Sequence, residues 1–552
     1  MRITDTSDLW WKTAVVYCLD VETYFDDDGD GVGDLAGLAR RIDYLADLGV
    51  TCLWLMPFYP TPDRDDGYDV TDFYGVDPRL GSHGDFVEVL RTAKDRGMRV
   101  IVDLVVNHTS DRHPWFREAR KSVDNPFRDF YVWRKDKPKK SAHAVFPGEE
   151  TSVWELDEKT GEYFLHSFYR HQPDLNVANP RVRDEIAKTI GFWLQLGVSG
   201  FRVDAVPFLL APDAGMDFGD PHEFLRDLRR FLQRRSSEAI LLGEVNLPYP
   251  EQLDYFGGAE GSELSMQFDF VGMQALWLSL ARRDPAPLVQ ALRQRPATAT
   301  ESQWANFVRN HDELTLDKLS DAERDEVFAA FAPDESQRIY GRGITRRVPP
   351  MLEGDPRRIR MLYSLLFCLP GTPVLFYGEE IGMGENPEIE GRESVRTPMQ
   401  WDATANGGFS TAPARRLVAR PPGNGWAPQH VNVVAQRDDE ASLLQHVRRL
   451  AARYRQSAEI GWGALEIVEQ DAPAVLVHTL RSDLGRFLGL HNFAENPATV
   501  DFALGDEPEG TVLVDLLGDA RIEPDAGRVS LELDAYGYRW FRVGRPGDGR
   551  LG

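Results

Sequence analysis

Eight short apolar runs, rich in β-branched residues, recur along the first two thirds of the chain and alternate with longer amphipathic runs. The strand-like runs are Ala14–Leu19, Thr51–Pro57, Arg99–Val106, Ser199–Val206, Ala239–Val245, Glu263–Phe270, Trp304–Asn310 and Pro373–Gly378. The helix-like runs include Leu35–Leu48, Gly84–Arg96, Val182–Leu196 and Pro221–Gln233. Strands that alternate with helices predict an α/β fold with a parallel sheet, and eight such units predict a closed (β/α)8 TIM barrel.

Two segments depart from this alternation. A long stretch rich in proline, aromatic and charged residues separates the third and fourth strand-like runs. After a helix at about Ala441–Arg455, short strands separated by turns are typical of an antiparallel β-sandwich. We therefore predict a first barrel part at 1–107, an inserted B domain at 108–180, a second barrel part at 181–440, and a C-terminal helix and β-sandwich domain at 441–552.

The charge and the cysteines exclude several classes of partner and location. The chain has 63 basic and 88 acidic residues, a net charge of −25, which argues against nucleic acid or an anionic membrane surface as a partner. Cys18, Cys52 and Cys368 lie in apolar runs, so we expect no disulfide framework and a cytoplasmic location. The N-terminal segment has no signal-peptide core, and prolines break the longest apolar stretch, which argues against a membrane span.

One of the apolar strands carries two charges. Arg202 and Asp204 are two residues apart, so on a strand both side chains point to the same face. Burying a charge is costly unless it is paired or functional. Other strand-like runs carry or precede Asp103, Glu244 and Asp312, and the carboxyl ends of barrel strands line the active site. A single such carboxylate is more often an ion-pair partner or a helix cap, but several together predict an active site.

Converging carboxylates favour glycoside hydrolysis or transfer. In the retaining reaction an ionised carboxylate attacks the sugar carbon, and a protonated carboxyl group protonates the leaving oxygen. We expect Arg202 to lower the pKa of Asp204, which makes Asp204 the predicted nucleophile. Glu244 follows an apolar run with no basic neighbour in sequence, so we expect a raised pKa and an acid/base role. Asp312 would be a third carboxylate that binds and distorts the sugar.

Five motifs resemble the conserved blocks of the alpha-amylase superfamily of glycoside hydrolases. They are DLVVNHTS (103–110), QPDLN (172–176), GFRVDAV (200–206), GEVN (243–246) and RNHDE (309–313). The resemblance implies a retaining enzyme for small α-glucosides, with a covalent glucosyl–Asp204 intermediate, Glu244 as acid/base, Asp312 as transition-state stabiliser and no organic cofactor. It also implies that the sugar in the −1 subsite contacts His108, Gln172, Arg202 and His311.

A sixth motif, DDGYD (65–69), resembles the pocket-forming motif of enzymes that bind a terminal glucose. The resemblance implies that Asp65 holds this glucose and that Tyr68 stacks on it. Arg396, in VRTPMQW, would pair with Asp65 and close the floor of the pocket.

The segment FDDDGDGVGD (25–34) imitates the start of an EF-hand loop. Its twelfth position is Gly37, where an EF-hand needs glutamate, so it is not an EF-hand. Such dense carboxylates repel one another without a cation, although a solvated acidic turn is the alternative. The superfamily resemblance implies a structural Ca²⁺ or Mg²⁺ held by Asp26, Asp28, Asp30, the carbonyl of Val32, and Asp34.

Within the superfamily, long runs such as LWLMPFYPTPDRDDGYDV and LPGTPVLFYGEEIGMG resemble trehalose synthases, which implies an isomerase that interconverts maltose and trehalose. An exo-acting α-glucosidase on short α-glucosides would use the same residues, while a non-catalytic relative conflicts with the intact carboxylates. An unusual stretch, Asp213–Phe224, leaves the identity of the acceptor molecule open. The segment Arg338–Pro350 is either a lid or plain surface. The sequence also leaves homo-oligomer formation open.

Overall fold

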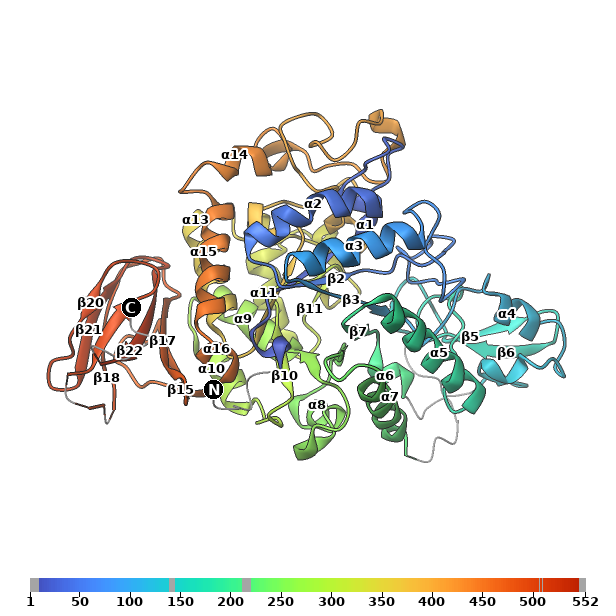
Figure 1. Ribbon diagram of the computed structural model, residues 1–552, viewed down its shortest axis with the longest axis horizontal. Coiled ribbons are helices and arrows are strands. Elements are labelled where there is room, and N and C mark those ends of the chain that lie inside the picture. The colour runs from blue at the N-terminus through green and yellow to red at the C-terminus, as the bar shows by residue number, and fades with distance from the viewer. Residues whose placement is uncertain (1–8, 139–143, 211–219, 506, 509, 546–552) are drawn as a thin grey trace.

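A closed barrel of eight parallel strands forms the centre of the computed structural model, which describes residues 9–138, 144–210, 220–505, 507–508 and 510–545 (Figure 1). Its strands are β1 (Val16–Leu19), β2 (Cys52–Leu55), β3 (Arg99–Leu104), β7 (Gly200–Val203), β8 (Ile240–Gly243), β9 (Met266–Phe268), β10 (Gln303–Asn306) and β14 (Thr372–Phe376). They follow one another around the barrel in this order, and β14 closes onto β1. The predicted barrel and its eight strands are confirmed.

Helices connect these strands and cover the barrel. The four predicted helices are found as α2 (Leu35–Leu48), α3 (His83–Asp95), α5 (Pro180–Leu196) and α7 (His222–Arg235). Local sequence sets their ends: the Asp34 carboxylate caps α2 by accepting from the backbone N–H of Gly37 at 2.6 Å, and Gly49 ends it at φ 96°. Longer helices beyond these are α8 (Tyr249–Tyr255), α9 (Phe270–Arg282), α10 (Ala286–Gln294), α11 (Asp321–Phe331), α13 (Pro356–Cys368) and α15 (Leu443–Gln456).

The shorter elements lie mainly in loops. The short helices are α1 (Val21–Tyr24), α4 (Pro114–Ala119), α6 (Val206–Leu209), α12 (Val348–Met351), α14 (Val433–Arg437) and α16 (Glu459–Trp462). A small sheet near the barrel rim joins β11 (Leu314–Thr315), β13 (Gly343–Ile344) and β12 (Arg338–Ile339).

The segment between β3 and α5 carries its own antiparallel sheet, ordered β4 (Trp133–Arg134), β6 (Glu162–Leu165), β5 (Trp154–Asp157). A bridge between His108 and Asp174 brings the two ends of this inserted segment together. Figure 1 shows its sheet at one end of the molecule and the C-terminal sheets at the other. The insertion therefore leaves and rejoins the barrel at one place, next to the carboxyl end of β3.

The C-terminal part is an antiparallel sandwich, as predicted. One sheet has the order β15 (Ala464–Ile467), β16 (Val475–Ser482), β17 (Gly485–Asn492), β22 (Tyr538–Gly544), β19 (Val512–Asp515), β20 (Arg521–Ile522), and the other pairs β18 (Ala498–Ala503) with β21 (Arg528–Leu533). All three cysteines are buried free thiols, as expected. Within the described ranges, no helix has the length and apolar character needed to cross a membrane.

A polar seam joins this sandwich to helix α13 of the barrel. The ring of His491 bonds through Nε2 to the hydroxyl of Ser364 at 2.9 Å, and Trp540 donates to the same hydroxyl at 2.9 Å. His478 donates from Nε2 to the carbonyl of Cys368 at 3.0 Å. Both imidazoles are fully buried, and their Nδ1 atoms have no hydrogen-bond partner among the described residues. Burial therefore disfavours protonation of both rings and outweighs the opposing effect of the Cys368 carbonyl on His478.

We expect this seam to make the fold sensitive to acid. Burial lowers the pKa of His478 to about 4, and burial together with His478 lowers the pKa of His491 well below its usual range. In the unfolded chain both groups have a pKa near 6.5, so unfolding takes up protons below that pH. The stabilisation is complete above about pH 6.5 and falls as the pH drops toward 4, by about 3 kcal/mol for His478 alone.

Calorimetric melting temperatures between about pH 4.5 and 7.5 test this prediction. His478→Gln should lower the melting temperature at pH 7.5 but flatten its decline with falling pH. His430→Gln changes an exposed histidine and should leave the decline unaltered. An equally steep decline in His478→Gln and the wild type would show that the seam is not the acid-sensitive element.

Candidate active site

Three carboxylates converge on the guanidinium of Arg202 at the carboxyl end of the barrel. The guanidinium bonds Asp103 at 2.5 Å, Asp204 at 2.6 Å and Glu244 at 2.6 Å. Arg202 is only 1% exposed, so its positive charge is buried together with its partners. This geometry confirms that Arg202 and Asp204 point to the same face, and it explains how an apolar strand can carry both charges.

The backbone around Asp204 is shaped for this contact. Ala205 adopts the left-handed conformation, φ 46° and ψ 42°, which is unfavourable for a residue with a side chain. Its N–H donates to the carboxylate of Glu244 at 3.3 Å. At the start of β7, a Cβ on Gly200 would lie 2.4 Å from the carbonyl oxygen of Ile240, so only glycine allows β7 to pack this closely on β8. The turn thereby holds Asp204 beside Glu244.

Burial dominates the electrostatics of the two predicted catalytic groups. It raises the pKa of Asp204 to about 6, against the attraction of Arg202 and with the repulsion of Asp103 and Asp312. Arg202 does act to lower this pKa, as expected, but the expected net decrease is not found: one buried guanidinium is shared among three carboxylates, and burial outweighs it. Burial raises the pKa of Glu244 to about 7, the expected direction, although Arg202 also contacts it. Near neutral pH, Asp204 is mostly ionised and Glu244 is partly protonated.

Asp312 lies in a different electrostatic setting, next to two arginines. Its carboxylate bonds Arg392 at 2.8 Å, Arg396 at 3.0 Å and His311 at 3.1 Å. Burial opposes its ionisation, but these neighbours outweigh that effect and lower the pKa of Asp312 well below its usual range. Burial also lowers the pKa of His311 to about 4, so the ring is neutral at pH 7 and the arginines balance the charge.

The predicted sugar-binding residues also lie close together. Gln172 donates to the Asp65 carboxylate at 2.7 Å. The hydroxyl of Tyr68 bonds Nε2 of His311 at 2.8 Å, and their rings stack at a centroid distance of 5.5 Å. His108 donates from Nε2 to the carbonyl of Tyr68 at 3.1 Å. The contacts fix the orientation of each buried side chain.

The expected ion pair between Arg396 and Asp65 is not present. Arg392 pairs with Asp65 instead, while Arg396 pairs with Asp66 at 2.7 Å. Arg392 is the second residue of a short 3₁₀ helix, Gly391–Val395, and lines the cavity. Arg396 follows that helix and donates from Nε to the carbonyl of His311 at 2.9 Å. The sequence offers a signal for Arg392, since it lies four residues before Arg396 in GRESVR.

Most of these groups line a cavity of about 430 Å³, a volume in the range of small-molecule sites. Its wall does not include Gln172, Arg202, His311 or Arg396. Asp65, Tyr68, His108, Asp312 and Arg392 lie on its wall together with Asp204 and Glu244. Other parts of the wall are apolar and come from the inserted segment and from helix α6, through Phe146, Phe168 and Phe208. The cavity therefore combines a charged end with aromatic walls, an arrangement that suits the polar rim and apolar faces of a sugar.

The segment Arg338–Pro350 contributes to this enclosure. Tyr340 packs against Phe146 with a centroid distance of 5.0 Å, and Arg342 donates to the carbonyl of Val145 at 2.7 Å. Arg342 also lines the cavity. The segment is therefore part of the site rather than plain surface. The neighbouring stretch 213–219 lies outside the described residues.

Comparison with known proteins identifies the family of the chain. Residues 21–329 and 344–463 match the family described as "Alpha amylase, catalytic domain". The chain belongs to the alpha-amylase family. Residues 485–542 of this alpha-amylase family member match "Sucrose hydrolase-like, C-terminal domain".

Individual relatives of this family member cover nearly all of it. A trehalose synthase of Thermus thermophilus is 42% identical over 97% of this chain, which spans 56% of that relative's length. A trehalose synthase of Pimelobacter sp. (strain R48) is 40% identical over 97% of this chain and 96% of its own. A mutant of MutB, the trehalulose synthase of Pseudomonas mesoacidophila MX-45, has been solved with its substrate sucrose. It is 27% identical, with a TM-score of 0.75 over 97% of this chain and 99% of its own.

Two acidic clusters lie outside the catalytic cavity. In the first, the carboxylate oxygens of Asp26, Asp28 and Asp34 lie within 4.8 Å of one another. Asp26 and Asp34 are buried, and within the described ranges neither has a lysine or arginine partner. Asp30 is not part of this group; its Oδ1 accepts from the backbone N–H of Val32 at 2.8 Å. Three convergent oxygens without a positive partner suit a hard cation.

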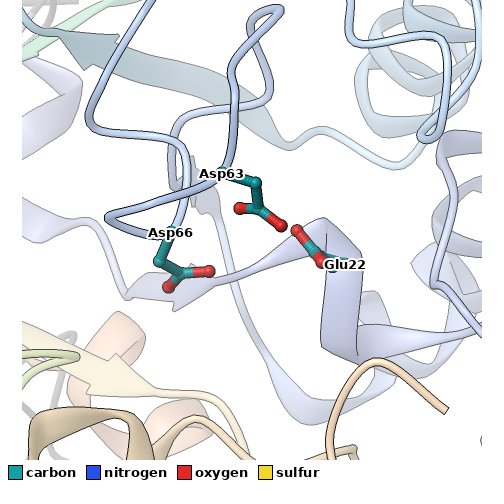
Figure 2. Close-up of side chains that lie close together, drawn as sticks. All are labelled: Glu22, Asp63 and Asp66. Atoms are coloured by element: carbon teal, nitrogen blue, oxygen red, sulfur yellow. The ribbon is translucent and has the colours of Figure 1, made fainter. Parts of the chain in front are cut away.

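The second cluster consists of Glu22, Asp63 and Asp66, whose carboxylates face one another (Figure 2). Arg79 pairs with Glu22 at 3.1 Å and with Asp63 at 2.8 Å, and Arg396 pairs with Asp66. Arginines thus supply each of these carboxylates with a positive partner. The first cluster is the better candidate for a metal.

We predict that Arg392 is essential to sugar binding. In Arg392→Ala, Asp65 loses its ion pair and Asp312 keeps only one of its two arginines. Leaving a buried charge unpaired costs about 2–5 kcal/mol, so kcat/KM for an α-glucoside should fall at least about 30-fold. Arg416→Ala, at an exposed position, is the matched control. A kcat/KM within about threefold of wild type in Arg392→Ala would refute the assignment.

Proposed function

We propose that this alpha-amylase family enzyme is a retaining glucosyl-transferring isomerase that interconverts maltose and trehalose. The observation that carries the proposal is the pairing of Asp204 and Glu244 on one guanidinium, in a cavity that also contains Asp65 and Tyr68. Near pH 7 Asp204 is mostly ionised and Glu244 is partly protonated, as a double displacement requires. The two relatives of about 40% identity that are named trehalose synthases support the choice of reaction.

In the first step, the Asp204 carboxylate attacks the anomeric carbon of the non-reducing glucose of maltose. The bond from that carbon to the bridging oxygen breaks, and Glu244 gives its proton to this oxygen as glucose is released. The transition state carries positive charge on the sugar ring. The Asp312 carboxylate, kept ionised by Arg392 and Arg396, would stabilise that charge.

In the second step, the released glucose reorients and directs its anomeric hydroxyl at the glucosyl–Asp204 ester. Glu244, now ionised, takes the hydroxyl proton while the oxygen displaces Asp204 and forms trehalose. Water attacking in place of this hydroxyl gives a second free glucose. Isomerisation therefore requires that the cavity hold the released sugar and limit the access of water.

The second candidate function is an exo-acting α-glucosidase for short α-glucosides. It uses Asp204, Glu244 and Asp312 in the same roles and differs only in the attacking molecule. The aromatic wall and the packing of Tyr340 on Phe146 favour retention of the sugar, and thus the isomerase.

A product profile decides between the two functions. We expect purified enzyme incubated with maltose to produce trehalose, and with trehalose to produce maltose, each with little free glucose, on anion-exchange chromatography. A main product of glucose from both sugars would establish the glucosidase instead.

Asp204→Asn is the chemical control for this experiment. It removes the nucleophile while keeping the shape of the side chain, so turnover of maltose should be lost. Activity within tenfold of wild type would refute the nucleophile assignment.

We further propose a cytoplasmic location and no organic cofactor. The buried free thiols of Cys18, Cys52 and Cys368 support a reducing compartment. Side chains already fill the nucleophile, acid/base and charge-stabilising roles, so the reaction needs no cofactor chemistry.

We also propose a structural Ca²⁺ or Mg²⁺ in the loop 26–34. Asp26, Asp28 and Asp34 would supply carboxylate oxygens, and Asp30 and the carbonyl of Val32 would complete the ligand set. Asp26 also accepts from Ser410 at 2.5 Å, and Asp34 caps α2, so the loop links several parts of the barrel. A cation there would relieve carboxylate repulsion and stabilise the fold without entering the reaction.

Removal of divalent cations tests this site. We expect EDTA to lower the melting temperature while the pH optimum moves little, and added Ca²⁺ to restore the melting temperature. Asp28→Ala should abolish this calcium response, whereas Glu22→Gln, in the arginine-paired cluster, should retain it. An unchanged melting temperature after metal loss, verified by elemental analysis, would remove the proposal.

A further inference from the structure

Asp317 ties together the segments that follow three successive barrel strands. Its carboxylate accepts from the side-chain amide of Asn246 at 3.0 and 3.2 Å and from Gln274 at 3.1 Å. Lys318 also pairs with it at 2.8 Å. Asn246 follows β8, Gln274 lies on α9 after β9, and Asp317 follows β10. One carboxylate thus links the segments that follow β8, β9 and β10, which the hydrogen bonds of the barrel sheet do not join to one another.

Asp317 also dictates which way the amide of Asn246 faces. Burial opposes ionisation of Asp317, but Lys318 and the amide donors outweigh it and lower its pKa. An ionised carboxylate only accepts hydrogen bonds, so Asn246 must present its NH₂ group to it. The Oδ1 atom of Asn246 is left buried, with no partner among the described residues. Without Asp317 the amide could rotate freely.

This network adjoins the predicted acid/base. Asn246 lies two residues after Glu244, and both side chains line the catalytic cavity, as does Asp317. Among the described residues, it shares no member with the ion-paired group of Asp65, Gln172 and Arg392 at the sugar-binding end. In the proposed reaction Glu244 gives its proton to the leaving sugar, so a network beside Glu244 and separate from that group is a candidate to contact this sugar.

We infer that Asp317 is a positioning residue that acts through Asn246 on the acceptor side of the cavity and sets how well the released sugar competes with water. The inference rests on the proposed function. A sugar must be held with one hydroxyl directed at the glucosyl carbon, whereas water has no such orientation to maintain. Loss of a fixed wall group therefore slows attack by the sugar more than attack by water.

The first experiment is Asp317→Asn in the full chain with maltose as substrate. We expect the ratio of free glucose to trehalose to rise about tenfold. Cleavage of p-nitrophenyl α-glucoside, whose leaving group needs little help from the acceptor side, should change less than about threefold. Asp321→Asn removes an exposed carboxylate, paired with Arg324 at 2.6 Å, and should leave the ratio unchanged. An unchanged ratio in Asp317→Asn would overturn the inference.

Asn246→Ala and the double variant test whether Asp317 acts through Asn246. Asn246→Ala alone should raise the ratio as much as Asp317→Asn does, so the test stands even where Asp317→Asn does not fold. In the Asn246→Ala background, Asp317→Asn should change the ratio less than about twofold. A full tenfold change in both backgrounds would show that Asp317 does not act through Asn246.

A second assay separates this inference from the proposed function. Wild-type enzyme that makes only glucose from maltose would contradict the isomerase. The glucosyl-enzyme formed from p-nitrophenyl α-glucoside can still be offered added glucose as an acceptor. A roughly tenfold smaller captured fraction in Asp317→Asn would then support the positioning role, and an equal fraction would overturn it.

Discussion

The buried guanidinium of Arg202, shared by three carboxylates, is the interaction on which the rest of the site depends. Register brings Asp103 and Arg202 together, because β3, β7 and β8 are neighbours and Asp103 lies directly opposite Arg202. Each partner would be an unpaired buried charge without the guanidinium, and the guanidinium would be one without them. The strained turn at Ala205 and the close approach at Gly200 serve the same end, since they bring Asp204 and Glu244 within reach of one side chain.

Sharing one cation among several acids also separates their protonation states. Arg202 is too heavily shared to keep the pKa of Glu244 low, so burial raises it to about 7. Asp312 has Arg392 and Arg396 as neighbours and stays ionised. The site therefore holds a proton donor and a permanent negative charge in the same cavity. The number of positive neighbours around each carboxyl group, more than whether it is Asp or Glu, determines its role.

Hydropathy periodicity was sufficient to predict the barrel, because parallel strands buried on both faces leave a strong local pattern. The strand-end carboxylates could be found for the same reason: they interrupt that pattern at Asp204 and Glu244. The sign of the pKa shift at Asp204 could not, since it depends on how many partners Arg202 has in space. Likewise, the choice of Arg392 over Arg396 for Asp65 depends on a 3₁₀ turn and a bond to a distant carbonyl.

Glucosyl transfer and hydrolysis use the same catalytic residues at the ends of the barrel strands. The loops must therefore determine whether a sugar or water attacks the intermediate. The walls around the leaving sugar come from the inserted segment, from the hairpin that carries Tyr340 and Arg342, and from the loops joined by Asp317. These segments lie outside the barrel sheet, so each can change without disturbing the barrel. A fold that fixes the nucleophile and the acid on adjacent strands thereby leaves the fate of the glucosyl intermediate to a few contacts at the rim.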